Sequence, residues 1–200
     1  RDGSIDWLCW PRFDSDACFS ALLGDPSHGR WQIRAMGDNI RISRRYRPHT
    51  LILETRFETE TGAATLIDFM PLRDGYSNLI RIVVGEHGEV RMCGELIIRF
   101  GYGATVPWVS RMPDRALRVI SGPDMLMLHA PVEMRGEDLK TVGEFTVKAG
   151  QKIPIVLTYS PSHLEPAEPV DPWQALGRTE KFWTGWAARC TWTGPWHDMV

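Results

Sequence analysis

Short segments of β type follow one another through most of this chain, and they constrain its fold more than any other feature. In Leu51–Thr59, the side chains alternate with the two-residue period of a strand that is buried on one face. Similar segments, separated by Gly, Pro, Asp or Asn, recur from Arg30 to Tyr159. The predicted strands are Trp31–Arg34, Ile40–Arg47, Leu51–Thr59, Ala64–Met70, Leu79–Val84, Val90–Phe100, Ala116–Ser121, Met125–Ala130, Val142–Val147 and Ile153–Tyr159.

Glycine-containing turns are expected to join neighbouring strands. Gly62 is predicted to reverse the chain after Leu51–Thr59, and SGPD at Ser121–Asp124 and KAGQ at Lys148–Gln151 are typical of hairpin turns. Helical periodicity is almost absent between the strands, and no internal repeat is found. The sequence therefore predicts an all-β fold, a large antiparallel β-sandwich (supersandwich), rather than an α/β fold.

The character of the sequence changes after Tyr159. The stretch SPSHLEPAEPVDP is too rich in proline for the interior of a sheet and indicates an extended linker. Asp171 is then placed to cap a helix whose first residue is Pro172. We therefore divide the chain into a β-sandwich domain at residues 1–160 and, at residues 161–200, a proline-rich linker with the start of a linker helix.

One face of this predicted helix is strongly apolar. The residues that recur at helical spacing are Trp173, Leu176, Thr179, Trp183, Trp186, Ala187 and Cys190. A face with several tryptophans requires a large partner surface, and the aromatic, proline-broken stretch at Thr191–Val200 offers none. We expect that a further domain follows and covers this face.

Composition excludes several classes of function. The formal net charge is -2 and no run of five or more like charges is present, which argues against nucleic acid and acidic lipid as partners. No apolar stretch approaches the length of a membrane span. The four cysteines are scattered, as is typical of free thiols in the cytoplasm, and the six histidines lack metal-ligand spacing. Common dinucleotide, triphosphate, serine-hydrolase and zinc-protease motifs are absent, so no cofactor and no metal are expected.

The opening stretch RDGSIDWLCWPRFDS concentrates carboxylates near turns. Asp2-Gly3 is a strong hairpin signal, after which Ser4–Cys9 is expected to return as a strand with Trp7 on the same face as Ile5. Asp6 with Asp14 or Asp16 has the residue types of an acid–base pair for glycoside cleavage. The alternative is local: Asp14 or Ser15 caps a short helix at Asp16–Leu23, which ends at Gly24.

Other side chains of this stretch suit contact with a sugar. Arg12 can present its guanidinium to a neighbouring carboxylate or to a sugar hydroxyl. Trp7, Trp10 and Phe13 can stack on a pyranose ring or pack in the core. The candidate residues for the rim of a substrate site are therefore Asp6, Trp7, Arg12, Phe13 and Asp14.

Several long segments, in a fixed order from Arg1 to Val200, resemble one family. They are RDGSIDWLCWPRFDSDACFSALLGDPSHGRW, RRYRPHTLILETRFET, LIDFMP, VPWV, GEDLKTVGEFTVKAGQKIPIVLTYSPSH and TEKFWTGWAARCTWTGPWHDMV. They are similar to the N-terminal region of bacterial glycoside hydrolase family 15 proteins, which are glucoamylase-like or trehalase-like. One departure is Gly101, where the resemblance implies an acidic residue.

The resemblance implies an N-terminal β-sandwich, a linker helix and then an α/α-barrel that carries both catalytic glutamates of an inverting α-glucosidic hydrolysis. Those glutamates would lie beyond Val200, so no catalytic residue is assigned to this chain. The expected partners are this downstream α/α-barrel catalytic domain and an α-glucoside substrate such as trehalose or maltooligosaccharide. Two alternatives stay open: a carbohydrate-binding or scaffold module without hydrolysis, and catalysis within the segment itself.

Overall fold

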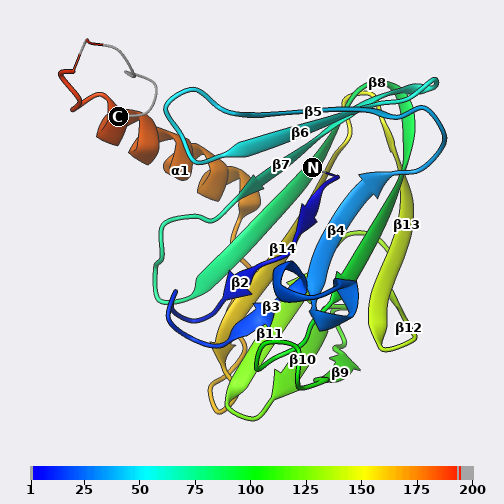
Figure 1. Cartoon of the computed structure of the whole chain (residues 1–200), viewed down its shortest axis with the longest axis vertical. Helices are drawn as coiled ribbons and strands as arrows, with labels where there is room; N and C mark the ends of the chain where they lie inside the picture. Colours follow the sequence, from blue (N-terminus) through cyan, green and yellow to red (C-terminus); the bar gives the residue numbers. More distant parts are fainter. Residues whose placement is uncertain (1, 193, 195–200) are drawn as a thin grey trace.

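The computed structural model describes residues 2–192 and 194 of the chain, and strands dominate it (Figure 1). Within these residues, 12 strands form one antiparallel sheet and β2 and β3 form a separate pair. The strands are β1 (Ser4–Ile5), β2 (Leu8–Cys9), β3 (Ala17–Phe19), β4 (Arg30–Ala35), β5 (Arg41–Tyr46), β6 (Leu53–Glu58), β7 (Gly62–Phe69), β8 (Ser77–Ile97), β9 (Trp108–Arg111), β10 (Leu117–Ser121), β11 (Asp124–His129), β12 (Arg135–Glu137), β13 (Lys140–Lys148) and β14 (Lys152–Pro161). Two 3₁₀ turns, η1 (Ala21–Leu23) and η2 (Pro26–His28), and the helix α1 (Pro172–Ala187) complete the described chain.

Strand β8 is shared by the two layers of the sandwich. Its first part pairs with β7 and β14, and its second part pairs with β4 and β13. One layer therefore has the order β5-β6-β7-β8-β14-β11-β10-β9, and the other contains β1, β4, β8, β13 and β12. The sequence predicted two strands here, at Leu79–Val84 and Val90–Phe100. That division is wrong, because the glycine-containing stretch between them continues the same strand. Gly88 in this stretch takes φ +62° and lies so close to the Thr61 carbonyl that a side chain there would clash with it.

The core lies between the layers, as the prediction of a β-sandwich requires. Large side chains from both layers, among them Trp31, Phe57, Leu66, Met92 and Leu157, are almost fully buried in one cluster. Burial of this apolar surface is the main favourable contribution to folding. The fold class is therefore confirmed.

Helix α1 packs on the outer face of the larger layer (Figure 1). Its contact residue Ala175 joins a second apolar cluster that includes Ile67, Ile80 and Ile82 of β7 and β8. As predicted, Asp171 caps the helix: its side chain accepts hydrogen bonds from the backbone N–H of Trp173 and Gln174 at 2.8 and 3.1 Å.

The predicted apolar side of this helix is buried only in its first half. Ala175 and Thr179 are buried against the sheet, whereas Phe182 and Trp186 are exposed. These four residues follow one another at helical spacing and lie on the same side of the helix, so the aromatic part of this side extends beyond the contact with the sheet. The aromatic stretch predicted at 191–200 lies largely outside the described residues.

The turns behave in two different ways. Ser121–Asp124 forms a hairpin in which Ser121 pairs with Asp124, as predicted. Lys148–Gln151 also forms a turn, with the Gln151 N–H donating to the Lys148 carbonyl at 2.9 Å. It is not a hairpin, however, because β13 and β14 pair with different parts of β8.

The N-terminal segment differs most from the prediction. The prediction of a helix at Asp16–Leu23 is wrong. Ala17–Phe19 is strand β3, which pairs with β2 and is completely buried. Only η1 remains helical, because pairing and burial outweigh the local capping signals. The strand expected at Ser4–Cys9 is broken into β1 and β2, so that Leu8 is buried and Trp7 is 40% exposed.

Candidate functional site

The loop between β2 and β3 holds three of the five residues that the sequence singled out. Arg12 donates to Asp14 twice, from Nε to Oδ1 at 2.9 Å and from Nη2 to Oδ2 at 2.5 Å. Phe13 between them is 94% exposed. Of the two alternatives for Arg12, the structure shows pairing with a neighbouring carboxylate, which fixes the shape of an exposed loop tip.

The other two candidates lie outside this loop. Asp6 accepts a hydrogen bond of 2.5 Å from the Ser4 hydroxyl. Trp7 lies against Tyr102 with a ring-centroid distance of 6.1 Å. Within the described part of the chain, no hydrogen bond or ring contact joins Asp6 or Trp7 to the Arg12–Asp14 loop. The five residues therefore form two groups rather than one constellation.

The β2–β3 loop is tied to the loop between β7 and β8. Arg73 donates from Nη1 to the Pro11 carbonyl at 3.3 Å. Figure 1 shows the two loops on the same side of the molecule, below α1. Trp10, which precedes this contact, is buried with its ring centroid 6.3 Å from that of Tyr159. This side of the sandwich therefore carries two neighbouring loops above a packed aromatic base.

A cavity of about 540 Å³ lies on this side, between the β7–β8 loop, the proline-rich linker and α1. Polar side chains are frequent in its wall, among them Arg73, Tyr76, Asn78, Glu165, Gln174 and Arg178. The Thr158 hydroxyl donates to Asn78 Oδ1 at 2.7 Å, whereas the buried hydroxyl of Thr179 makes no hydrogen bond within the described residues. Sequence reasoning missed this cavity because its walls combine residues 71–78 with residues 158–179, which are far apart in the chain.

The carboxylates whose pKa values are shifted are shifted downward. Burial acts to raise the pKa of Glu54, but hydrogen bonds from Arg47 and Arg45 outweigh it and hold that pKa below the ordinary value. Burial also opposes the shift at Glu95, where bonds from Arg30 and Lys140 lower the pKa. A general acid for glycoside cleavage needs the opposite shift. Glu54 and Glu95 are therefore ion-pair partners of basic side chains and do not have the properties of proton donors.

The described residues contain no cluster of metal ligands, because no group of three or more His, Cys, Asp or Glu side chains among them can hold an ion. The four cysteines are free thiols. Burial raises the pKa of the Cys18 thiol far above its ordinary value, so this side chain belongs to the core. His197 lies outside the described residues. No helix among them is both long and apolar enough to cross a membrane.

Together, the sandwich, the outer helix and the two loops define a β-sandwich domain with an aromatic outer helix. Residues 1–170 match the family described as "Trehalase-like, N-terminal". The chain belongs to this family.

Curated relatives are all longer than this chain. It is 35% identical to Trehalase 1 of Sulfolobus acidocaldarius over 113 residues, which cover 56% of this chain and 19% of that protein. It is 45% identical to a trehalase of Mycobacterium tuberculosis over 60 residues, which cover 30% of this chain and 9% of that protein. A trehalase of Thermoplasma volcanium is 22% identical over 206 residues, covering 100% of this chain and 33% of that protein. The chain thus spans a third or less of the length of these relatives.

Proposed function

We propose that this chain is the non-catalytic N-terminal β-sandwich domain of an inverting α-glucosidic hydrolase of the trehalase or glucoamylase type. Residues 1–160 form the sandwich, and residues 161–200 form the linker and the start of the helix that leads to an α/α-barrel catalytic domain. The substrate of the whole protein is an α-glucoside such as trehalose or maltooligosaccharide. The family match and the trehalases of three organisms support this assignment.

The observation that carries the proposal is the exposed aromatic surface in the second half of α1. Phe182 is 41% exposed and Trp186 is 50% exposed. Phe182 and Trp186 both make edge contacts with Trp183, with centroids 5.2 and 6.0 Å away. Contiguous exposed aromatic surface of this kind is typical of an interface. A helix that packs on the sheet with its first half and exposes rings in its second half is suited to lie between two domains.

The sandwich fixes the position of this aromatic face. Arg47, beside β5, donates to Glu54 at 2.7 Å and to Glu180 of α1 at 3.1 Å, so an ion-pair network joins sheet and helix. In our proposal, α1 supports the catalytic barrel, and the β2–β3 segment reaches the rim of its active site. Asp6, Trp7, Arg12, Phe13 and Asp14 are then rim residues, and none of them is catalytic.

The test compares two exposed tryptophans in the full-length protein. We expect Trp186→Ala to lower both Tm and the rate of trehalose hydrolysis, because it removes aromatic surface from the domain interface. Trp108→Ala is the matched control, since Trp108 is 79% exposed on β9, far from α1 (Figure 1). In the 200-residue chain, neither substitution should change Tm appreciably. An unchanged full-length Trp186→Ala protein would contradict the interface.

Cytoplasmic location is also part of the proposal, and the four free thiols support it because a reducing compartment keeps cysteines unpaired.

A second candidate function is a carbohydrate-binding module without hydrolysis. The polar 540 Å³ cavity, with Tyr76 and Arg178 in its wall, favours it because sugars are bound by rings and hydrogen-bonding side chains. Titration of the chain's tryptophan fluorescence with trehalose and maltooligosaccharides distinguishes the two functions. A saturable change that Arg178→Ala abolishes would support the module, and an unchanged spectrum would leave the supporting role as the function.

A further inference from the structure

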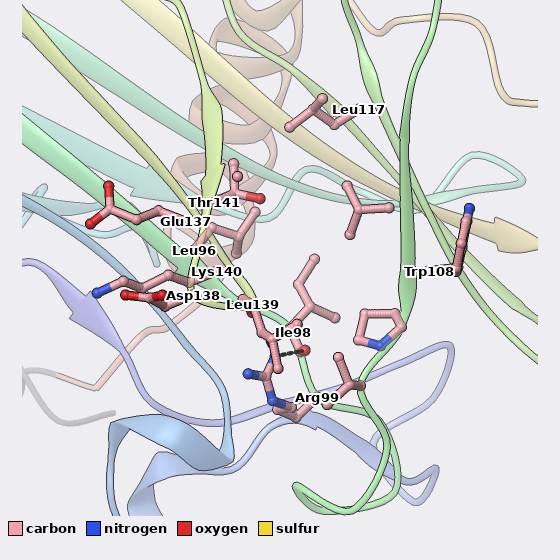
Figure 2. A pocket seen from close by; sticks show the side chains of 14 residues that line it. Leu96, Ile98, Arg99, Trp108, Leu117, Glu137, Asp138, Leu139, Lys140 and Thr141 are labelled. Atoms are coloured by element: carbon pink, nitrogen blue, oxygen red, sulfur yellow. Dashed lines mark hydrogen bonds between the residues drawn. The ribbon is translucent and has the colours of Figure 1, made fainter.

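A second cavity lies at the other end of the sandwich, where the two layers separate. It has a volume of about 380 Å³ and lies between β9 of one layer and the β12–β13 hairpin of the other. Figure 2 shows that the labelled apolar side chains Leu96, Ile98, Leu117 and Leu139 face a common space. Trp108 also lines the cavity, and Figure 2 shows its side chain on the other side of β9 from these aliphatic side chains. The wall of the cavity is thus mainly aliphatic.

One charged group lies at the end of this apolar wall. Arg99 is only 9% exposed, and Figure 2 shows its guanidinium beside Leu139. Its Nη1 donates to the carbonyl oxygens of Ile98 and Leu139 at 2.8 and 3.1 Å. Neither Nε nor Nη2 makes a hydrogen bond within residues 2–192 and 194. Donors therefore remain available on a side chain that lines the cavity.

The nearby carboxylates are directed elsewhere. In Figure 2, Glu137 and Asp138 point away from the apolar side chains. Glu137 lies 3.4 Å from Arg135, and Glu95 accepts from Lys140 at 3.1 Å. Over the described part of the chain, no carboxylate lies within ion-pair distance of Arg99, and two carbonyl dipoles do not neutralise a full charge.

The same sandwich shows how a buried arginine is otherwise accommodated. Arg81, which is fully buried, has a carboxylate partner in Asp68. Arg99 has no such partner, and burial lowers the pKa of its guanidinium. A buried charge without a counterion is costly, and an anion beside it removes much of that cost. The cavity is thus complementary to a molecule with a negative group at one end and an apolar body.

We propose that this cavity binds a small organic carboxylate whose apolar body is an aliphatic chain of about six carbon atoms. The carboxylate would accept hydrogen bonds from the free donors of Arg99, and a paired guanidinium–carboxylate contact is among the stronger ones in proteins. The chain would lie against Ile98, Leu117 and Leu139. Figure 1 shows that β9 and β12 lie far from α1, so this site is independent of the proposed domain interface.

The test is a calorimetric titration of the protein with hexanoate and, separately, with hexanamide. The two probes share the aliphatic chain and differ in charge. We expect hexanoate to saturate one site at least tenfold more tightly than hexanamide, and its affinity to fall as salt is added.

Two variants and one control connect this binding to the cavity. Arg99→Met should weaken hexanoate at least tenfold while leaving hexanamide unchanged. Val106→Trp should weaken both probes, because it fills the space without touching the charge. Arg91→Met is the control: Arg91 is an exposed arginine on β8, the strand that ends just before Arg99, and this variant should bind hexanoate like the unsubstituted protein. Equal affinity for both probes, retention of hexanoate by Arg99→Met, or no saturable binding of hexanoate would each overturn the proposal.

Discussion

Arg81 and Asp68 form a two-point ion pair inside the sandwich. Nε of Arg81 donates to Oδ1 of Asp68 at 2.7 Å, and Nη2 donates to Oδ2 at 3.0 Å. The same guanidinium donates to the carbonyls of Trp31 and Gly3 at 2.6 and 2.7 Å, and lies 5.0 Å from the centroid of the Trp31 ring. One side chain of β8 therefore joins β7, β4 and the N-terminal segment.

Removal of one partner of this pair should be strongly destabilising. Asp68→Ala leaves the Arg81 charge buried without its carboxylate, and we expect the free energy of unfolding to fall by about 3–5 kcal/mol. Urea denaturation of the variant and of the unsubstituted protein measures this loss of free energy. The control is Asp14→Ala, which removes the exposed partner of Arg12 and should cost less than about 1 kcal/mol. Equal losses in the two variants would contradict the role of the buried pair.

Thr179 and Thr158 offer a matched test of buried hydroxyls. The Thr179 hydroxyl has no hydrogen-bond partner within the described residues, whereas the Thr158 hydroxyl donates to Asn78. Thr179→Val should therefore leave the free energy of unfolding unchanged or raise it, and Thr158→Val should lower it by about 1 kcal/mol. Thermal and urea unfolding of both variants give the comparison. The reverse order of stability would refute the assigned hydrogen bonding.

His129 should make stability depend on pH. Burial lowers its pKa below 6.5, while Asp114, whose Oδ2 lies 3.9 Å from Nε2, acts weakly in the opposite direction. Because the unfolded chain takes up a proton near pH 6.5 and the folded chain does so only at lower pH, stability should fall as the pH falls below 6.5.

The experiment measures the free energy of unfolding between about pH 7 and pH 5. His129→Gln should reduce the decline over this interval. His49→Asn is the control, because His49 is exposed with φ +59°, a conformation that asparagine tolerates. If His129→Gln leaves the decline unchanged, groups other than His129 cause the pH dependence of stability.

The proposed rim residues can be tested in the full-length protein. We expect Arg12→Ala and Trp7→Ala to lower kcat/KM for trehalose several-fold, since each removes one contact worth about 1 kcal/mol. Arg91→Ala, which changes an exposed arginine on β8, serves as the control. Variants with both kcat/KM and Tm unchanged would exclude this segment from the rim.

Local patterns in the sequence predicted the elements that depend on neighbouring residues. The strand at Leu53–Glu58 follows the two-residue alternation, and α1 begins after its capping Asp171, as expected. Pairing between strands that are distant in the sequence determines the elements that were predicted wrongly. Ala17–Phe19 is a strand because it pairs with β2, although the capping signals around it favour a helix. The continuity of β8 was equally hidden, because its glycines are typical of a turn.

The candidate sites show the same division. The pairing of Arg12 with Asp14 is local, and it was one of the two roles considered for Arg12. The environment of Arg99 depends on residues 96–141 from several strands, which no local pattern brings together. Gly101, the one departure from the family resemblance, takes φ +59° in the turn just after Arg99, a conformation that glycine adopts readily.

In the proposed function, this chain supports catalysis and does not perform it. The most direct test of this proposal is glucose release from trehalose, measured with the purified 200-residue chain and with the full-length protein at equal concentration. We expect hydrolysis by the full-length protein and none by the 200-residue chain. Release of glucose by the 200-residue chain alone would contradict it.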